Sequence, residues 1–340
     1  MSKILTISVA AYNIEPYINE LMDSIIQANC MDDLEILIIN DGSKDQTSSL
    51  AYEYVKAYPN SVKLVEKENG GHGSTINKGI ELATGKYFRA LDGDDWVNSN
   101  NLRDLVSLLK KADADMIVCD YDKCFSDGKN ETQKLGSLVA LQEYSFSEAI
   151  SHIKWICYHN IVYKTNILKD NNIHLDEHCF YVDTEYDLFP IPYINTLLYF
   201  SKPVYCYRLG IEGQSVSPTN RMKNIKHGHI VTQSLLELYS QRKEYMSDAQ
   251  KKYIAFGIAD HCAWNIQSYF FFPASRSIQK EIIDYDLWIK ERSMDVFRRM
   301  EKLGKDSRSI VAMRRTKYAL YWLIKMYKSM KTLYLRTRHI

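Results

Sequence analysis

The densest group of chemically capable side chains is Leu91-Asp92-Gly93-Asp94-Asp95-Trp96, in which three carboxylates follow a short apolar run. Close carboxylates repel one another, and a cation among them relieves that repulsion. Their hard oxygen ligands suit Mg²⁺ or Mn²⁺, and such ions commonly bridge to diphosphate oxygens. The simpler alternative is a polar turn that caps the following helix.

Three more polar clusters follow apolar runs in the first part of the chain. They are Val9-Ala10-Ala11-Tyr12-Asn13 with Glu15, Asn40-Asp41-Gly42-Ser43-Lys44-Asp45, and Asn69-Gly70-Gly71-His72-Gly73. The glycines of the third cluster let the backbone pass close to a ligand and open a helix, although a plain turn between a loop and a helix explains them as well.

The elements that position these clusters follow from hydrophobic periodicity. Strands are expected at Ile4–Ala11, Leu34–Ile39, Val62–Val65, Tyr87–Leu91 and Met116–Cys119. Helices are expected over Ile18–Ile26, from an N-cap at Asp45, over Thr75–Ala83 and over Leu102–Leu109. Such alternation predicts an α/β fold, a mostly parallel sheet flanked by helices. Ligands of such sheets bind beyond the carboxyl ends of the strands, where the polar clusters lie.

Four motifs resemble glycosyltransferase family 2 in their order and spacing. They are a strand ending in Tyr-Asn, an Asp-Gly-Ser turn, an Asn-x-Gly helix start and a Leu-Asp-x-Asp-Asp segment. The resemblance covers roughly residues 3–215. It implies the GT-A nucleotide-diphospho-sugar transferase fold. It also implies metal-dependent, inverting transfer of a sugar from a nucleotide-diphosphate donor, expected to be a UDP-sugar, to an acceptor hydroxyl.

The resemblance assigns roles to residues one by one. Glu15 and the backbone around Ala11 and Tyr12 would line the nucleoside, and Asp41 would hydrogen-bond a pyrimidine base, with an Asx-turn as the alternative. Mn²⁺ or Mg²⁺ would be bound by Asp94 and Asp92, with Asp95 on the sugar or behind the metal. The remaining expected donor-binding residues are Gly71, Gly93, Arg208 and Asp92. Asp92 would also face the ribose.

Arg208 belongs to a stretch, Tyr205 to Ser217, that resembles the Tyr-x-x-Arg…Ser-x-Ser tail of many family members. Arg208 would bind donor phosphate or an anionic acceptor. The loop after it would close over the diphosphate as a lid. A surface salt bridge and a plain loop are the alternatives.

The catalytic base is expected in Phe180-Tyr181-Val182-Asp183-Thr184-Glu185-Tyr186. The resemblance places the base at Asp183, but Val182 stands where the family usually has Glu. Glu185 would be the base instead of Asp183 if the alignment with the family motif is shifted by two residues. A helix N-cap at Asp183 is the structural alternative, since a carboxylate suits that position.

The rest of the chain is expected to complete the first domain and to add a helical one. Residues 1–218 would form the catalytic domain, with a nucleotide-binding half at 1–120 and an acceptor half at 121–218, in which 121–145 is a loop or hairpin. Residues 219–340 would be helical. After Asp306 the sequence has basic and aromatic residues but no acidic one. That pattern predicts a basic amphipathic helix in peripheral contact with a membrane surface, with a packed helix or a homodimer contact as alternatives.

Bulk properties limit the function classes. The formal net charge of +1 argues against a nucleic-acid partner. An N-terminus without a signal peptide predicts a cytoplasmic protein, peripheral at the inner face of the membrane. The expected acceptor is a lipid-linked saccharide of capsule, exopolysaccharide or another cell-surface glycan. Two alternatives stay open: a non-catalytic partner subunit, and an NAD-type oxidoreductase suggested by Gly71-His72-Gly73.

Overall fold

The computed structural model describes residues 3–153, 155–210, 215–305 and 307–337, and it divides into two compact units, Met1–Glu212 and Gly213–Ile340. The predicted boundary after residue 218 lies a few residues beyond this division, and the two-domain organisation stays a prediction. The expected lid lies partly outside the described residues, which exclude 211–214.

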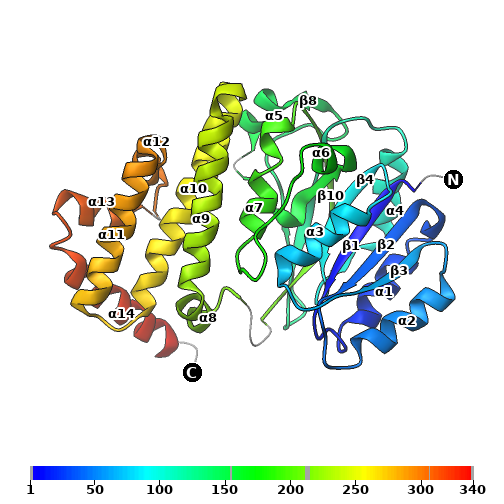
Figure 1. Ribbon diagram of the computed structural model, residues 1–340, viewed down its shortest axis with the longest axis horizontal. Helices are drawn as coiled ribbons and strands as arrows, with labels where there is room; N and C mark the ends of the chain where they lie inside the picture. The colour runs from blue at the N-terminus through cyan, green and yellow to red at the C-terminus, as the bar shows by residue number, and fades with distance from the viewer. Residues whose placement is uncertain (1–2, 154, 211–214, 306, 338–340) are drawn as a thin grey trace. The chain divides into compact units, whose positions relative to one another are not determined.

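The first unit is built on one sheet with the strand order β3-β2-β1-β4-β9-β6-β10-β5, in which β7 also pairs with β6 and β8 with β10 (Figure 1). β1 pairs in parallel with β2 and β4, and β2 pairs in parallel with β3. The expected α/β class is therefore confirmed. The strands are β1 (Leu5–Ala11), β2 (Leu34–Asn40), β3 (Val62–Glu66), β4 (Tyr87–Asp92), β5 (Trp96–Val97), β6 (Met116–Phe125), β7 (Asn130–Gln133), β8 (Glu143–Ser145), β9 (Ile161–Lys164) and β10 (Thr196–Leu209).

The sheet becomes mixed beyond β4. β9 lies antiparallel to both of its neighbours, β4 and β6, whereas β6 and β10 are parallel. Because β9 runs against β4, the short 3₁₀ helix η2 (Tyr158–Asn160) that precedes it lies toward the carboxyl end of β4. This antiparallel strand therefore brings a distant segment to the edge where the carboxylates lie.

Helices cover the sheet in the first unit (Figure 1). Every residue of β2 is buried, as expected for a strand covered on both faces. α1 packs through the apolar stripe Ile18, Leu21, Met22 and Ile25, all fully buried. The helices are α1 (Ile18–Ile26), α2 (Thr47–Ala57), α3 (His72–Leu82), α4 (Ser99–Leu109), α5 (Phe146–His152), α6 (Thr165–Asp170) and α7 (Asp183–Leu188).

Two helix starts differ from expectation. Asp45 is not the N-cap of α2: the helix begins at Thr47, and Oδ1 of Asp45 accepts from the Thr47 amide at 3.0 Å. α3 begins at His72 rather than Thr75, because Gly71 adopts φ = 82° and turns the chain into the helix three residues early. The second difference places His72 in the first turn of α3. In the 121–145 stretch, the expected hairpin is formed by β6 and β7.

The second unit is helical, as expected (Figure 1). Its helices are α8 (Pro218–Lys223), α9 (Ile225–Arg242), α10 (Asp248–Ser268), α11 (Arg276–Arg292), α12 (Met294–Arg299), α13 (Arg308–Arg315) and α14 (Tyr321–Thr337). None of the described helices combines the length and the apolar composition that a membrane span requires.

The basic C-terminal segment forms two helices rather than one. Lys317 and Tyr318 adopt positive φ angles of 48° and 64°, which separates α13 from α14. The basic face is also smaller than the sequence indicates. Arg314 pairs with the buried Asp286, and the Lys325 ammonium donates to a backbone carbonyl and is buried.

Candidate active site

The three carboxylates lie in the turn that joins β4 to β5. Oδ1 of Asp92 lies 2.9 Å from Nε2 of His72 in the first turn of α3, and it accepts from the Tyr158 hydroxyl at 3.1 Å. Gly93 is required for packing, because an added Cβ would lie 2.6 Å from the carbonyl oxygen of Ala10. The turn is therefore pressed against β1, with Asp92 held between α3 and η2.

Asp95 is almost fully buried, and both its oxygens are held from β10. Oδ2 accepts from the Tyr205 hydroxyl at 2.6 Å, and Oδ1 accepts from the Arg208 amide at 2.7 Å. The Arg208 guanidinium donates through Nε to the carbonyl of Asp94 at 2.7 Å and pairs with Glu20 at 2.7 Å. Arg208 thus fastens the turn, while its expected contact with donor phosphate stays a prediction.

The electrostatics of the turn reflect its crowded carboxylates. Burial and the charge of Asp92 raise the pKa of Asp94 to about 6. Burial, Asp92 and Asp94 together raise the pKa of Asp95 well above its ordinary value. Burial also opposes ionisation of Asp92, but the charge and hydrogen bond of His72 outweigh it, so the pKa of Asp92 is lowered. Excess negative potential of this kind is what a divalent cation would neutralise.

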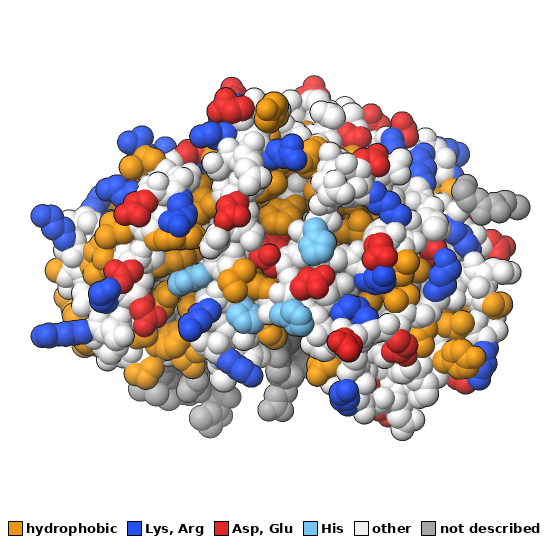
Figure 2. All heavy atoms as spheres, in the orientation of Figure 1, with side chains coloured by type: hydrophobic (Ala, Val, Ile, Leu, Met, Phe, Trp, Pro, Cys, Tyr) orange, Lys and Arg blue, Asp and Glu red, His pale blue; other side chains and the backbone are white. Residues whose placement is uncertain are grey.

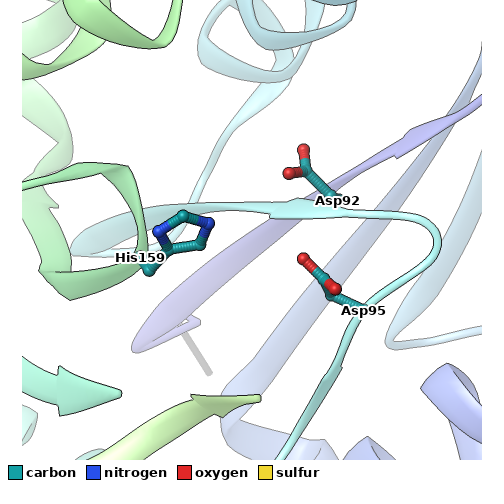
Figure 3. Close-up of side chains that lie close together, drawn as sticks. All are labelled: Asp92, Asp95 and His159. Carbon is teal, nitrogen blue, oxygen red and sulfur yellow. The ribbon is translucent and has the colours of Figure 1, made fainter. Parts of the chain in front are cut away.

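Figure 3 shows Asp92, Asp95 and His159 around one space. Each offers one ligand atom, and these three atoms lie within 4.8 Å of one another. His159 comes from η2, and its ring stacks on Tyr121 with centroids 5.0 Å apart. Burial lowers the pKa of His159 to about 4, so its ring is neutral and able to act as a ligand. Asp94, the expected direct ligand, is not in this group of three.

The donor set fits a divalent cation. Two carboxylates and a neutral imidazole gather in one place, and a third carboxylate, that of Asp94, is in the same turn. Carboxylate oxygens suit Mg²⁺ and Mn²⁺, while an imidazole ligand suits transition metals better than Mg²⁺.

The residues expected to line a nucleoside follow β1 and are joined to the loop after β2. Ala11 is buried, whereas Tyr12 is 52% exposed beside it. Oε2 of Glu15 accepts from the Gln46 amide at 3.0 Å, and the Glu15 amide donates to Asp45 at 3.0 Å. These contacts join the segment after β1 to the loop after β2, next to the exposed Tyr12 ring.

Asp41 is buried and holds the loop that contains Gly70 and Gly71, which we call the glycine loop. Oδ1 accepts from the Gly70 amide at 2.8 Å and from the Lys67 ammonium at 2.6 Å, and Oδ2 accepts from the Gly71 amide at 2.8 Å. Its predicted hydrogen bond to a base stays untested. The preceding residue, Asn40, accepts from the Ser43 amide, three residues on, through Oδ1 at 3.1 Å.

Asp183 is the first residue of α7, and Val182 occupies the N-cap position. The Asp183 side chain is exposed, but nearby protein atoms displace part of its hydration water, and this desolvation raises its pKa. The charge of His72 acts in the opposite direction and lowers the pKa. His72 also interacts with the charges of Asp92 and Asp94. The expected base and the expected metal ligands are therefore coupled through one imidazole.

Glu185, the alternative base, occupies a different environment. It is fully buried, and Oε2 accepts from the Asp176 amide at 2.8 Å. Its other oxygen, Oε1, has no hydrogen-bond partner among the described residues. Burial and the Asp176 side chain raise the pKa of Glu185 to about 9, although the Asp176 amide acts in the opposite direction. A neutral, inaccessible acid makes a poor general base, so the geometry favours Asp183 over Glu185.

Three site residues were missed as ligands or supports by the sequence interpretation: Tyr158, His159 and Tyr205. Near them in the sequence, Tyr163 belongs to the core, since it is fully buried and its hydroxyl donates to the Tyr186 carbonyl at 3.1 Å. The only sequence signal for the missed residues is the aromatic density around positions 158 and 205.

Comparison with known proteins matches more than half of the chain to a family. Residues 6–183 match the family Glycosyl transferase family 2. EpsH of Bacillus subtilis is 36% identical over 123 residues, which are 36% of this chain and 35% of EpsH. The uncharacterized glycosyltransferase EpsJ of the same organism is 28% identical over 214 residues, which are 61% of this chain and 62% of EpsJ. The chain thus spans from about a third to about six tenths of these relatives.

A third relative also has a solved structure. The poly(ribitol-phosphate) beta-N-acetylglucosaminyltransferase TarS of Staphylococcus aureus is 26% identical over 216 residues, which are 62% of this chain and 36% of TarS. A crystal structure of TarS residues 1–349 in complex with UDP-GlcNAc superposes with a TM-score of 0.61 and 20% identity, covering 86% of this chain and 82% of that one. At this identity the likeness establishes the fold, and the expected GT-A fold is confirmed.

Proposed function

Because the chain belongs to glycosyl transferase family 2, we propose that it moves a sugar from a nucleotide-diphosphate donor to a hydroxyl group of an acceptor. The observation that carries the proposal is the carboxylate turn after β4, which lies at the carboxyl edge of a sheet, next to the ends of β1 and β2. Nucleotides bind at that edge in α/β proteins. The NAD-type alternative loses its support, because the family match includes Gly71-His72-Gly73.

The proposed donor is a UDP-sugar. The TarS structure contains UDP-GlcNAc, and it superposes on 86% of this chain with a TM-score of 0.61. The nucleoside would lie on the exposed Tyr12 ring beside Ala11 and Glu15. Asp41 would position the Gly70 and Gly71 amides, whether or not it also contacts the base.

The proposed cation is Mn²⁺ or Mg²⁺, with Asp92 and Asp94 as its proposed ligands. Asp95 and His159 would be further ligands, because their ligand atoms lie within 4.8 Å of that of Asp92. When bound, it would neutralise the negative charge that develops on the departing diphosphate. His72 orients Asp92 through its ring, and Tyr158 does so through its hydroxyl. Tyr205 and Arg208 fix Asp95 and the backbone of Asp94. Rigid support of this kind keeps metal-binding groups in a productive geometry.

Asp183 is the proposed general base. It would take the proton from the acceptor hydroxyl as that oxygen attacks the anomeric carbon, and the bond to the diphosphate oxygen would break with inversion. A raised pKa suits this role, because a stronger base accepts the proton more readily. The presence of Val182 instead of Glu motivates the competing proposal of a non-catalytic subunit.

The proposed acceptor is a lipid-linked saccharide used in cell-surface polysaccharide assembly at the cytoplasmic face of the membrane. Support comes from TarS, whose name gives a poly(ribitol-phosphate) acceptor. Support also comes from the basic C-terminal segment, which suits an anionic lipid surface.

A donor panel tests the proposal. The purified chain is incubated with Mn²⁺ and, in turn, UDP-glucose, UDP-galactose, the UDP-N-acetylhexosamines and dTDP-rhamnose, and nucleotide release is measured. Metal-dependent release from one donor is expected. Tight donor binding without release, with or without membrane extract as an acceptor source, would instead favour the non-catalytic subunit.

A further inference from the structure

Helix α14 carries a stripe of large apolar side chains on its outer face. They occur at positions i, i+1, i+4, i+5 and i+8, which fall on one side of an α-helix. The exposed fractions are 45% for Trp322, 58% for Leu323, 54% for Met326, 63% for Tyr327 and 55% for Met330. We refer to these five residues as the α14 stripe.

The opposite side of α14 is packed against its own unit. Tyr321 is fully buried, and the Lys325 ammonium donates to the carbonyl of Phe270, which follows α10. Just before α14, the Tyr318 carbonyl accepts from Gln279 of α11 at 3.0 Å. The helix is therefore docked by one side, and the α14 stripe is the side left exposed.

A recess of about 560 Å³ adjoins the stripe. Trp322 and Met326 contribute to it from α14, and the aromatic segment 271–274 contributes from the other side. A continuous exposed apolar surface of this kind marks an interaction site in a soluble unit.

The charges around the stripe indicate the kind of partner. From Ser307 to Met330 the chain has six basic residues and no acidic one. Arg308, Arg315 and Lys317 are exposed, while Arg314 is neutralised by Asp286. By contrast, α11, which includes exposed Leu287, has both acidic and basic residues in its sequence. On the face of the molecule shown in Figure 2, acidic and basic side chains are likewise interspersed. A second copy of the chain would bring like charges together, whereas an anionic lipid surface supplies the opposite charge.

We propose that α14 is an interfacial membrane helix that inserts the α14 stripe among the headgroups and upper acyl chains of an anionic bilayer, with Arg308, Arg315 and Lys317 on lipid phosphates. Trp and Tyr are suited to this interface, since each has an apolar ring with a polar group. The proposal deepens the membrane contact of the proposed function, on which it rests for its purpose, by assigning binding to apolar insertion rather than to basic charge alone.

Vesicle sedimentation with the full chain tests the proposal. A stripe variant, Leu323→Ser with Met326→Ser and Tyr327→Ser, is compared with a control, Tyr245→Ser with Leu287→Ser, which removes exposed apolar side chains elsewhere in the unit. Vesicles contain phosphatidylcholine with or without phosphatidylglycerol. The wild type and the control are expected to bind anionic vesicles, and the stripe variant to bind at least about tenfold more weakly.

Salt and fluorescence separate insertion from charge attraction. Apolar insertion is not screened, so measurable wild-type binding is expected to persist at 0.5 M salt, roughly five times the ionic strength at which the Debye length is about 10 Å. Lipids brominated on the acyl chain are expected to quench the wild type more than Trp322→Phe. Equal binding by the wild type and the stripe variant, or equal quenching of the wild type and Trp322→Phe, would overturn the proposal.

The oligomeric state distinguishes a lipid partner from a second copy of the chain. If the wild type sediments as a dimer and does not bind vesicles, while the stripe variant is a monomer, the stripe is assigned to a second copy and the lipid proposal is overturned.

Nucleotide release from the UDP-sugar donor, measured without vesicles, is expected to be equal in the wild type and the stripe variant. Loss of vesicle binding alone in the stripe variant supports the inference. A wild type with vesicle binding but no donor turnover would count against the proposed function only.

Discussion

The hydroxyl of Tyr205 donates a hydrogen bond to Oδ2 of Asp95 at 2.6 Å, across 110 positions of the chain. The same hydroxyl accepts from the Asp92 amide at 3.2 Å. One phenol on β10 therefore fixes both ends of the carboxylate turn that follows β4. This contact gives the turn a rigid geometry before any donor binds.

Tyr205→Phe removes that hydroxyl and keeps the ring. The turn loses a donor to Asp95 and an acceptor for Asp92, so the affinity for Mn²⁺ is expected to fall by roughly 10- to 100-fold. Tyr199→Phe is the matched control, because the Tyr199 hydroxyl, also on β10, donates to Asp120 instead. Manganese binding is followed by electron paramagnetic resonance, and equal affinity in the two variants would refute the support role.

Much of the first unit could be predicted from the sequence, because the strands β1 to β4 and their helices are regular and locally encoded. Asp92, Asp94 and Asp95 follow directly from an apolar strand, so their place at the sheet edge needed only periodicity. The contacts of Tyr158 and His159 could not be predicted in this way. They depend on β9 running antiparallel beside β4, which a short run of four residues does not reveal.

The roles of polar side chains were harder to predict than their positions. The Asp41 carboxylate accepts from the Gly70 and Gly71 amides, contacts that the sequence does not reveal, while its expected hydrogen bond to a base stays a prediction. Arg314 and Lys325 belong to the basic segment expected to face a membrane, but Arg314 pairs with Asp286 and Lys325 is buried. Sequence spacing places such residues on an element, whereas the partner that each one finds depends on how distant elements pack.

Asp183→Asn tests the general base. The amide cannot accept the proton of the acceptor hydroxyl, so sugar transfer is expected to fall by about 10²- to 10⁴-fold, while UDP affinity stays close to that of the wild type. Asp127→Asn, an exposed position between β6 and β7, is the control. Transfer by Asp183→Asn at the rate of Asp127→Asn would remove Asp183 from the mechanism.

Glu185→Gln tests the buried acid of α7 through the pH dependence of stability. The folded pKa of Glu185 is raised to about 9 from an ordinary 4.5, so its contribution to stability is complete at low pH and is lost as pH rises through that window. The loss is at most about 1.4 kcal/mol per pH unit. Glutamine has no proton to lose, so the variant is expected to gain thermal stability relative to the wild type at pH 8 and not at pH 4. If Glu185→Gln and the wild type differ in thermal stability by the same amount at pH 8 and at pH 4, the pKa of Glu185 is not raised in the folded protein.

Arg314→Met tests the ion pair that holds α13. Nε and Nη2 of Arg314 donate to the two oxygens of Asp286 at 2.9 and 2.6 Å, and Asp286 is fully buried. Removal of the arginine leaves an uncompensated buried charge, with an expected loss of about 3–5 kcal/mol in the free energy of unfolding. The double variant with Asp286→Leu is expected to recover much of that loss. Urea denaturation measures both, and a double variant less stable than Arg314→Met would contradict this account.

Calorimetric titration of UDP into the wild type and Asp94→Asn, each with and without Mn²⁺, is the most direct test of the carboxylate turn as the place where a cation holds the donor diphosphate. We expect Mn²⁺ to strengthen UDP binding to the wild type by at least about tenfold, which corresponds to about 1.4 kcal/mol, and to have little effect on Asp94→Asn. Equal UDP affinity with and without Mn²⁺ in the wild type, or an undiminished effect of Mn²⁺ in Asp94→Asn, would contradict the account.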